Sequence, residues 1–260
     1  MIMANPLIFL HGWGLHGGIW QPLTERLAQV MTGRPLLTPD LPGYGGQPDA
    51  ASLEAGARQL LAGGPARFDL VGWSLGGLFA LKMAQLAPER IGRLVLVGTS
   101  PCFVSRPGWH CGMEASVFAG FARDLEDEWE PTLKRFLALQ VRQDAHARAT
   151  LASLRQQLFA RGRPQPSVLR SGLQLLLQTD LRDALSAITT PTLVVQGAYD
   201  QLVPVCAAET LAGGQPDLQP GGLPNARLVI MPGASHAPFL SHEAAFAELL
   251  AGFVSPTEAS

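Results

Sequence analysis

The chain has 260 residues, of which 47% are hydrophobic, so it can bury the core of one large α/β domain or of a domain with a sizeable insertion. Its formal net charge of −2 excludes the strongly basic class of general nucleic-acid binders. No run approaches the roughly 18 apolar residues of a membrane span. The N-terminus lacks the basic region and cleavage site of a secretory signal, so we expect a cytoplasmic protein without membrane contact. We also expect a monomer.

Six short apolar runs alternate with longer segments of helical spacing. The runs cover residues 7–10, 35–38, 68–71, 94–97, 192–195 and 227–230. Helical spacing lies between them, as over 22–30 and 75–87. Continuous apolar strands that alternate with helices predict a mostly parallel sheet flanked by helices, which is the α/β class. In such sheets the reactive groups lie on loops beyond the carboxyl ends of the strands.

Residues 102–186 break this alternation. Four helical patterns fill them, over 114–127, 131–140, 144–159 and 167–178, with Gly162-Arg163-Pro164 as a breaker between the last two. Four helices without a strand predict a helical cap inserted into a core domain made of residues 1–101 and 187–260. Residues 213–224 are rich in Gly and Pro and predict a surface loop, and the residues from about 255 predict a frayed tail.

The three cysteines are Cys102, Cys111 and Cys206, and they show neither a CxxC spacing nor a histidine at metal-ligand spacing. An odd and sparse set argues against a disulfide framework and for a reducing compartment. We therefore expect buried or inert thiols and no metal site.

Gly72-Trp73-Ser74-Leu75-Gly76 matches the G-x-S-x-G nucleophile elbow, between a predicted strand and a predicted helix. A sharp turn there exposes the Ser74 hydroxyl, and the start of the helix points free N–H groups at developing negative charge. The alternative is a tight turn that happens to contain serine. The correct flanks and two further partners in the expected order disfavour it.

A serine hydroxyl is a weak nucleophile and needs a base, and the chain order for this elbow is serine, acid, histidine. Asp200 follows the strand predicted over 192–195, and His236 follows the strand predicted over 227–230. The carboxylate can then accept a hydrogen bond from the imidazole and fix its tautomer. We predict a triad of Ser74, Asp200 and His236 that needs no cofactor and no metal.

Other histidines and carboxylates are weaker candidates. His11 is expected to support its loop, His242 to start a helix, and His110 and His146 to be exposed on the cap. No carboxylate follows the strand over 94–97, where some proteins with this elbow carry the acid. Two residues at the end of the cap remain alternatives for the acid: Asp180 and Asp183.

His11-Gly12-Trp13-Gly14 follows the first strand. That loop and the residue after the nucleophile each supply one N–H to an oxyanion, so Trp13 and Leu75 are the predicted donors. The Trp13 indole is expected to form a wall of the substrate pocket, with a purely structural core aromatic as the alternative. The turn Asp40-Leu41-Pro42-Gly43-Tyr44-Gly45 is interpreted as structural.

Several motifs together resemble a known family. They are His11-Gly12-Trp13-Gly14-Leu15, Gly72-Trp73-Ser74-Leu75-Gly76-Gly77-Leu78, Ser100-Pro101-Cys102-Phe103, Phe136-Leu137-Ala138-Leu139-Gln140, Thr179-Asp180-Leu181-Arg182 and Ala234-Ser235-His236-Ala237-Pro238-Phe239. The chain resembles α/β-hydrolases throughout. More narrowly, it resembles the pimeloyl-[acyl-carrier protein] methyl ester esterases of biotin synthesis.

The narrower resemblance implies hydrolysis of the methyl ester of a pimeloyl group on its carrier protein. It implies a substrate site lined by Trp13, Ser74, Leu75, Phe136, Leu137, Ala138, Leu139, Gln140 and His236. It also implies that basic cap residues meet the acyl-carrier protein. Arg135 and Arg142 are retained, whereas Pro131 and His146 stand at two other basic positions, and the amino-terminal hairpin of the family is shortened or absent.

The residues themselves leave alternatives open. Phe118, Phe121, Phe136 and Leu139 can enclose a medium acyl chain or simply pack the cap. Arg135 and Arg142, with Lys134 nearby, can bind an anionic partner or form a solvated helix face. The triad also fits a general short-chain carboxylesterase, a C–C bond hydrolase, a perhydrolase or an aminopeptidase. A ligand receptor without activity is a further alternative.

Overall fold

The computed structural model describes residues 5–161, 165–213 and 221–255. Six strands form one parallel sheet in the order β2-β1-β3-β4-β5-β6. Their bounds are Leu7–Leu10 (β1), Leu36–Leu37 (β2), Phe68–Trp73 (β3), Ile91–Val97 (β4), Thr192–Gly197 (β5) and Ala226–Met231 (β6). All six predicted strands are confirmed, and β2 is shorter than predicted.

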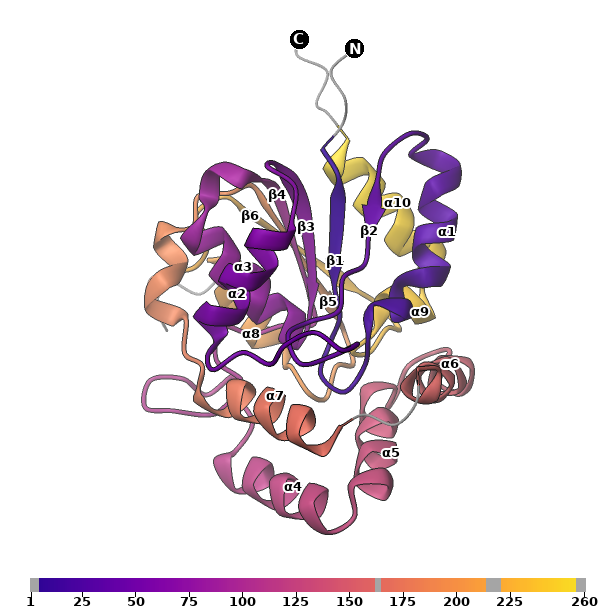
Figure 1. Cartoon of the computed structure of the whole chain (residues 1–260), viewed down its shortest axis with the longest axis vertical. Helices are drawn as coiled ribbons and strands as arrows, with labels where there is room; N and C mark the ends of the chain where they lie inside the picture. The colour runs from indigo at the N-terminus through magenta and orange to yellow at the C-terminus, as the bar shows by residue number, and fades with distance from the viewer. Residues whose placement is uncertain (1–4, 162–164, 214–220, 256–260) are drawn as a thin grey trace.

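Helices cover both faces of the sheet (Figure 1). On one face lie α2 (Leu53–Gly63), α3 (Leu75–Leu86) and α8 (Val205–Leu211). On the other lie α1 (Gln21–Val30), α9 (Pro238–Ser241) and α10 (Glu243–Val254). Every residue of β1, β3 and β5 is buried, which explains why these strands are mainly apolar on both faces rather than alternating.

Four helices lie between β4 and β5 in the chain and gather beyond the carboxyl ends of the strands (Figure 1). They are α4 (Ala115–Asp127), α5 (Trp129–Gln140), α6 (Ala147–Phe159) and α7 (Pro166–Gln178). Pro131 falls in the first turn of α5, as predicted. The division at residues 101/102 and 186/187 into core and cap stays a prediction. The breaker at 162–164, most of the loop at 213–224 and the tail after 255 lie outside the described residues.

The cysteine prediction is wrong for two of the three residues. A disulfide joins Cys111, in the loop before α4, to Cys206 at the start of α8, with 5.8 Å between the Cα atoms. Only Cys102 is a buried free thiol. The two partners are 95 residues apart, so their spacing carried no sign of the pair. The cysteines therefore no longer argue for a reducing compartment.

Across the three described ranges, no helix is long and apolar enough to cross a membrane.

Candidate active site

Ser74 sits in the sharp turn between β3 and α3, with φ 54° and ψ −118°. A positive φ is uncommon for a residue other than glycine and is held only where the surroundings impose it. Three hydrogen bonds fix this backbone. Ser74 N donates to Val97 O at 3.0 Å, and Ser74 O accepts from Thr99 Oγ1 at 2.8 Å and from Gly77 N at 2.9 Å.

Glycine at position 76 lets the start of α3 lie against β1. A Cβ on Gly76 would stand 2.5 Å from the carbonyl oxygen of Leu10, closer than any side chain allows. This close approach sets the turn that presents Ser74, and only glycine tolerates it.

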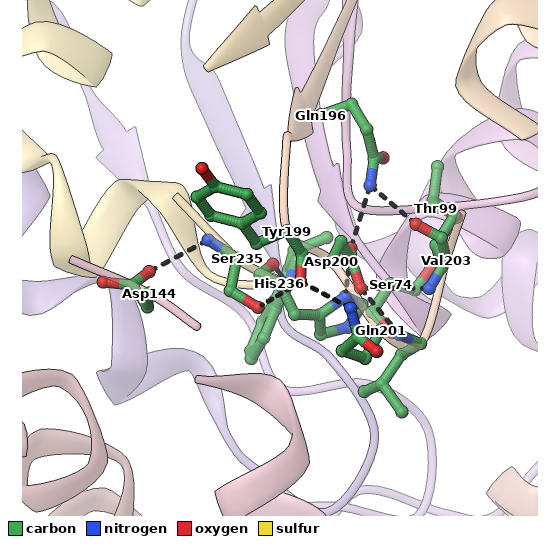
Figure 2. Close-up of polar contacts among 12 residues, drawn as sticks. Ser74, Thr99, Asp144, Gln196, Tyr199, Asp200, Gln201, Val203, Ser235 and His236 are labelled. Atoms are coloured by element: carbon green, nitrogen blue, oxygen red, sulfur yellow. Dashed lines mark hydrogen bonds and ion pairs between the residues drawn. The ribbon is translucent and has the colours of Figure 1, made fainter. Parts of the chain in front are cut away.

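Asp200 and His236 form a buried pair behind this turn (Figure 2). His236 Nδ1 lies 2.7 Å from Asp200 Oδ2. The other carboxylate oxygen, Oδ1, accepts from Leu202 N at 2.9 Å and from Val203 N at 3.0 Å. Because an ionised carboxylate only accepts hydrogen bonds, Nδ1 carries the imidazole proton and Nε2 keeps its lone pair.

The side chain of Trp73 holds His236 next to the elbow. Trp73, the residue before Ser74, donates from its indole Nε1 to His236 O at 2.9 Å, and the two rings lie 5.6 Å apart. Among the described residues, the Ser74 hydroxyl makes no hydrogen bond of its own. Hydrogen bonds between nucleophile and base are often long in the absence of substrate, so the lack of this bond is compatible with His236 as the base for Ser74.

Two backbone N–H groups are available for an oxyanion. Within the described part of the chain, neither Trp13 N nor Leu75 N donates a hydrogen bond. Leu75 is the first residue of α3, where an N–H has no intrahelical acceptor and adds to the positive end of the helix dipole. The sequence predicted these two donors, and their role stays a proposal.

An apolar pocket opens beside Ser74. It is lined by Trp13, Ser74, Phe103, Met113, Val117, Phe118, Phe121, Phe136, Leu139, Leu173, Leu176 and Leu202. None of these residues is charged. The Trp13 indole forms a wall, with its ring 5.5 Å from Phe121 and 5.0 Å from Phe136 and its Nε1 donating to Leu169 O at 2.9 Å.

The pocket includes only part of the predicted run on α5. Phe136 and Leu139 line it, because residues three apart share one face of a helix. Leu137 and Gln140 are buried on other faces and Ala138 is exposed, so these three do not line the described pocket. The four residues expected to enclose an acyl chain all line it: Phe118, Phe121, Phe136 and Leu139.

The other histidines lie in structural positions, as predicted. His11 is fully buried, with Nδ1 donating to Gly12 O at 2.8 Å and Nε2 accepting from Leu41 N at 3.0 Å. Burial lowers the pKa of His11 to about 4. His242 precedes the first residue of α10, and its Nδ1 lies 2.9 Å from Ser241 Oγ. Two others are exposed: His110 and His146.

The two alternative acids do not reach His236. Asp180 accepts two hydrogen bonds from the Arg182 guanidinium, and these hold the pKa of Asp180 below its ordinary value. Asp183 is exposed in the short helix that follows. The structure thus places Asp200 beside His236, and neither Asp180 nor Asp183 takes that position.

The turn at 40–45 is structural, as predicted. Asp40 accepts from Gly17 N at 2.6 Å and pairs with Arg161 at 2.7 Å. The buried Tyr44 hydroxyl accepts from Gly14 N at 3.1 Å and so braces the loop that follows β1.

Two buried polar residues at the site escaped the sequence analysis. Gln196 donates to Asp200 Oδ2 at 3.0 Å, and Asp144 accepts from Ser235 N at 2.9 Å (Figure 2). Gln196 carried one signal, since it is a polar residue at the end of a continuously apolar strand. Nothing in the sequence around Asp144 indicated its role, because its partner Ser235 is 91 residues away.

The three basic residues singled out on the cap, Lys134, Arg135 and Arg142, are exposed, and two of them are already paired. Arg135 binds Asp124 at 2.7 Å, and Lys134 binds Glu130 at 2.8 Å. Of the two arginines expected to meet a carrier protein, Arg142 has no ion-pair partner among the described residues. Arg142 is therefore the stronger candidate.

Comparisons with known proteins identify the family of the chain. Residues 7–249 match the alpha/beta hydrolase family. The pimeloyl-[acyl-carrier protein] methyl ester esterase of Aromatoleum aromaticum is 43% identical over 242 residues, which cover 91% of this chain and 92% of that protein. The protein of the same name from Nitrosomonas europaea is 40% identical over 237 residues, 90% of each chain. Among solved structures, an esterase from Exiguobacterium antarcticum has a TM-score of 0.83 at 24% identity and covers 96% of this chain and 92% of its own.

These matches span the core and the four inserted helices alike. The chain therefore belongs to the alpha/beta hydrolase family and, within it, to the group of the pimeloyl-[acyl-carrier protein] methyl ester esterases.

Proposed function

We propose that the chain is a serine carboxylesterase that hydrolyses the methyl ester of a pimeloyl group carried by acyl-carrier protein. The observation that carries the proposal is the buried Asp200–His236 pair behind a strained Ser74, in a chain that is 40% and 43% identical to two esterases of that name. The products are methanol and the free carboxylate of the pimeloyl group.

In the proposed first step, His236 Nε2 takes the proton of the Ser74 hydroxyl while Ser74 Oγ attacks the ester carbonyl carbon. The N–H groups of Trp13 and Leu75 hold the resulting oxyanion. Asp200 keeps the Nδ1 proton in place and stabilises the imidazolium through the 2.7 Å hydrogen bond. Collapse of the intermediate expels methoxide, which leaves as methanol with the proton from His236.

In the second step, water attacks the acyl-Ser74 ester and gives its proton to the same imidazole nitrogen. The second tetrahedral intermediate collapses, Ser74 Oγ recovers the proton, and the carboxylic acid departs. The two reaction steps need no redox partner, because no atom changes its oxidation state between ester and acid.

The pocket favours an uncharged acyl chain. Its lining is aromatic and aliphatic apart from Ser74, so a methylene chain buries apolar surface there. No cation among the described residues lines it to pair with a carboxylate, so a substrate whose acid is masked as a methyl ester fits better than the free acid.

Methanol release from methyl pimeloyl-carrier protein tests the proposal directly. We expect turnover by the wild type and a fall in kcat of about 10⁴-fold or more for Ser74→Ala. The chain should also restore growth without biotin to a strain that lacks this esterase. Equal methanol release by Ser74→Ala and the wild type would remove Ser74 from its role.

Comparison of substrates separates this function from others that the triad can perform. Methyl esters of dicarboxylates should be hydrolysed faster than matched amides, diketones or short monoacid esters. A higher kcat/KM on amides or diketones than on the dicarboxylate esters would assign the site to a different reaction.

The proposal includes a contact between the acyl-carrier protein and the basic residues of the cap. Arg142→Glu should raise KM for the carrier-bound substrate several-fold and leave a small p-nitrophenyl ester unaffected, because rim charges act mainly on association. Arg135→Glu should have a smaller effect, since Arg135 is already paired with Asp124. Arg58→Glu on α2, which breaks a surface pair with Glu54, is the control.

A further inference from the structure

Three hydrogen bonds join the turn between α5 and α6 to the loop that carries His236. We call residues 140–146 the α5–α6 turn and residues 233–236 the histidine loop. His236 N donates to Gln140 O at 3.0 Å, and Ala145 N donates to Gly233 O at 2.8 Å. Between them, Ser235 N donates to the carboxylate of Asp144 at 2.9 Å (Figure 2).

Asp144 is the one side chain in this set of three bonds, and it is itself held in place. It is buried, and its second oxygen accepts from His146 N at 2.7 Å. Its own backbone N donates to Val141 O at 3.0 Å. A carboxylate that accepts backbone N–H groups forms charge-assisted bonds, which are shorter and stronger than neutral ones.

The same helix that ends in this turn forms part of the pocket. Phe136 and Leu139 of α5 line the pocket, and Gln140 at the end of α5 binds the backbone of His236. One helix thus lines the pocket and binds the backbone of His236. The position of α5 is therefore linked to that of the loop that carries the imidazole.

We infer that Asp144 is a positioning residue, whose carboxylate fixes the histidine loop to the α5–α6 turn and holds the His236 imidazole in line with Ser74. The inference rests on the proposed function of the triad and adds a residue to it. Asp144 touches neither substrate nor reacting atoms, so its loss should act on kcat rather than on KM.

Asp144→Ala and Asp144→Asn test the inference, with p-nitrophenyl butyrate as the substrate and a fluorophosphonate as a label for Ser74. Asp144→Ala should lower kcat and the labelling rate about tenfold to a hundredfold, the scale of a small misplacement of a catalytic group, and leave KM within about twofold. Asp144→Asn keeps one acceptor oxygen, so both rates should fall between those of Asp144→Ala and the wild type.

Ser171→Ala is the matched control. Ser171 on α7 donates to Asp49 at 2.9 Å, so this change also cuts a hydrogen bond between an inserted helix and the core, far from the histidine loop. The thermal midpoint of each variant measures how far the substitution destabilises the fold. A readout that does not depend on activity is the proton NMR signal of His236 Nδ1–H, which should broaden in Asp144→Ala and stay sharp in Ser171→Ala.

The outcomes separate the two proposals. A folded Asp144→Ala or Asp144→Asn with wild-type kcat, labelling rate and Nδ1–H signal would overturn the inference, as would an equal loss in Ser171→Ala. A wild type that neither hydrolyses esters nor reacts with the fluorophosphonate would overturn the proposed function. The Nδ1–H signal would still report whether Asp144 positions His236.

Discussion

Gln196 donates a hydrogen bond of 3.0 Å to the carboxylate oxygen of Asp200 that also receives the imidazole N–H of His236. The same amide nitrogen donates to Val203 O at 2.8 Å, which fixes the side chain at two points. Gln196 is fully buried. Asp200 Oδ2 therefore has two fixed donors, and the carboxylate is oriented before any substrate binds.

Gln196→Leu should lower kcat about tenfold and leave KM unchanged, because a hydrogen bond to a buried charge contributes on the order of 1.5–3 kcal/mol. Ester hydrolysis at saturating substrate measures the effect. Gln201→Leu is the matched control, since Gln201 is exposed and its amide contacts Tyr199 O rather than Asp200. Equal kcat values for Gln196→Leu and Gln201→Leu would show that Asp200 does not need this donor.

Gly98 gives a second test of the pair. Gly98 has φ 47°, and a Cβ there would lie 3.1 Å from His236 Nδ1 and 3.3 Å from Asp200 Oδ2. Gly98→Ala should therefore disturb the hydrogen bond between these two residues and lower kcat by tenfold or more, on the order of 1.4 kcal/mol in barrier height.

Gly46→Ala separates backbone strain from contact with the triad. Gly46 also has a positive φ, 80°, but a Cβ there meets no atom within 4 Å. Both variants should lose about 1–2 kcal/mol in the free energy of unfolding, since both place alanine in the left-handed region. Only Gly98→Ala should lose activity, and a comparable loss in Gly46→Ala would contradict the steric argument.

The sequence predicted the parts of the fold that local patterns encode. Apolar runs located all six strands, and the Ser74 elbow followed from glycines that the backbone requires. Long-range pairs were missed, because the Cys111–Cys206 disulfide and the bond from Ser235 to Asp144 each join residues more than 90 positions apart. The run from Phe136 to Gln140 was assigned to the site as a block, although helical geometry turns three of its residues away from the pocket.

The Cys111–Cys206 disulfide closes a long loop that includes all four inserted helices. Cys206→Ser should lower the free energy of unfolding by about 2–4 kcal/mol, the usual range for a native disulfide. Reductant should lower the thermal midpoint of the wild type and leave that of Cys206→Ser unchanged. Thiol titration of the unfolded chain provides a direct check, since a disulfide leaves only Cys102 reactive before reduction. Three reactive thiols before reduction would contradict the disulfide.

Acid should destabilise the protein through His11. Since Gly12 O can only accept and Leu41 N can only donate, His11 must carry its proton on Nδ1 and keep Nε2 bare. Burial lowers the pKa of His11 from 6.5 to about 4, so between these values the unfolded chain binds a proton that the folded chain does not. The stabilisation is complete above pH 6.5 and is lost as the pH falls through about 4.

The free energy of unfolding, measured by urea titration between pH 7 and pH 4, checks this dependence. The wild type should lose a few kcal/mol over that range, since one pKa unit corresponds to about 1.4 kcal/mol. His16, whose pKa burial and Arg161 also lower, adds to the slope in the same direction. His11→Gln removes the two hydrogen bonds of the buried ring, so it should be less stable than the wild type at pH 7. Because glutamine cannot take up a proton, this variant should lose less stability on acidification. His110→Gln, which changes an exposed histidine, should keep the wild-type slope. An identical slope in His11→Gln would mean that other groups, and not the buried His11, cause the acid sensitivity.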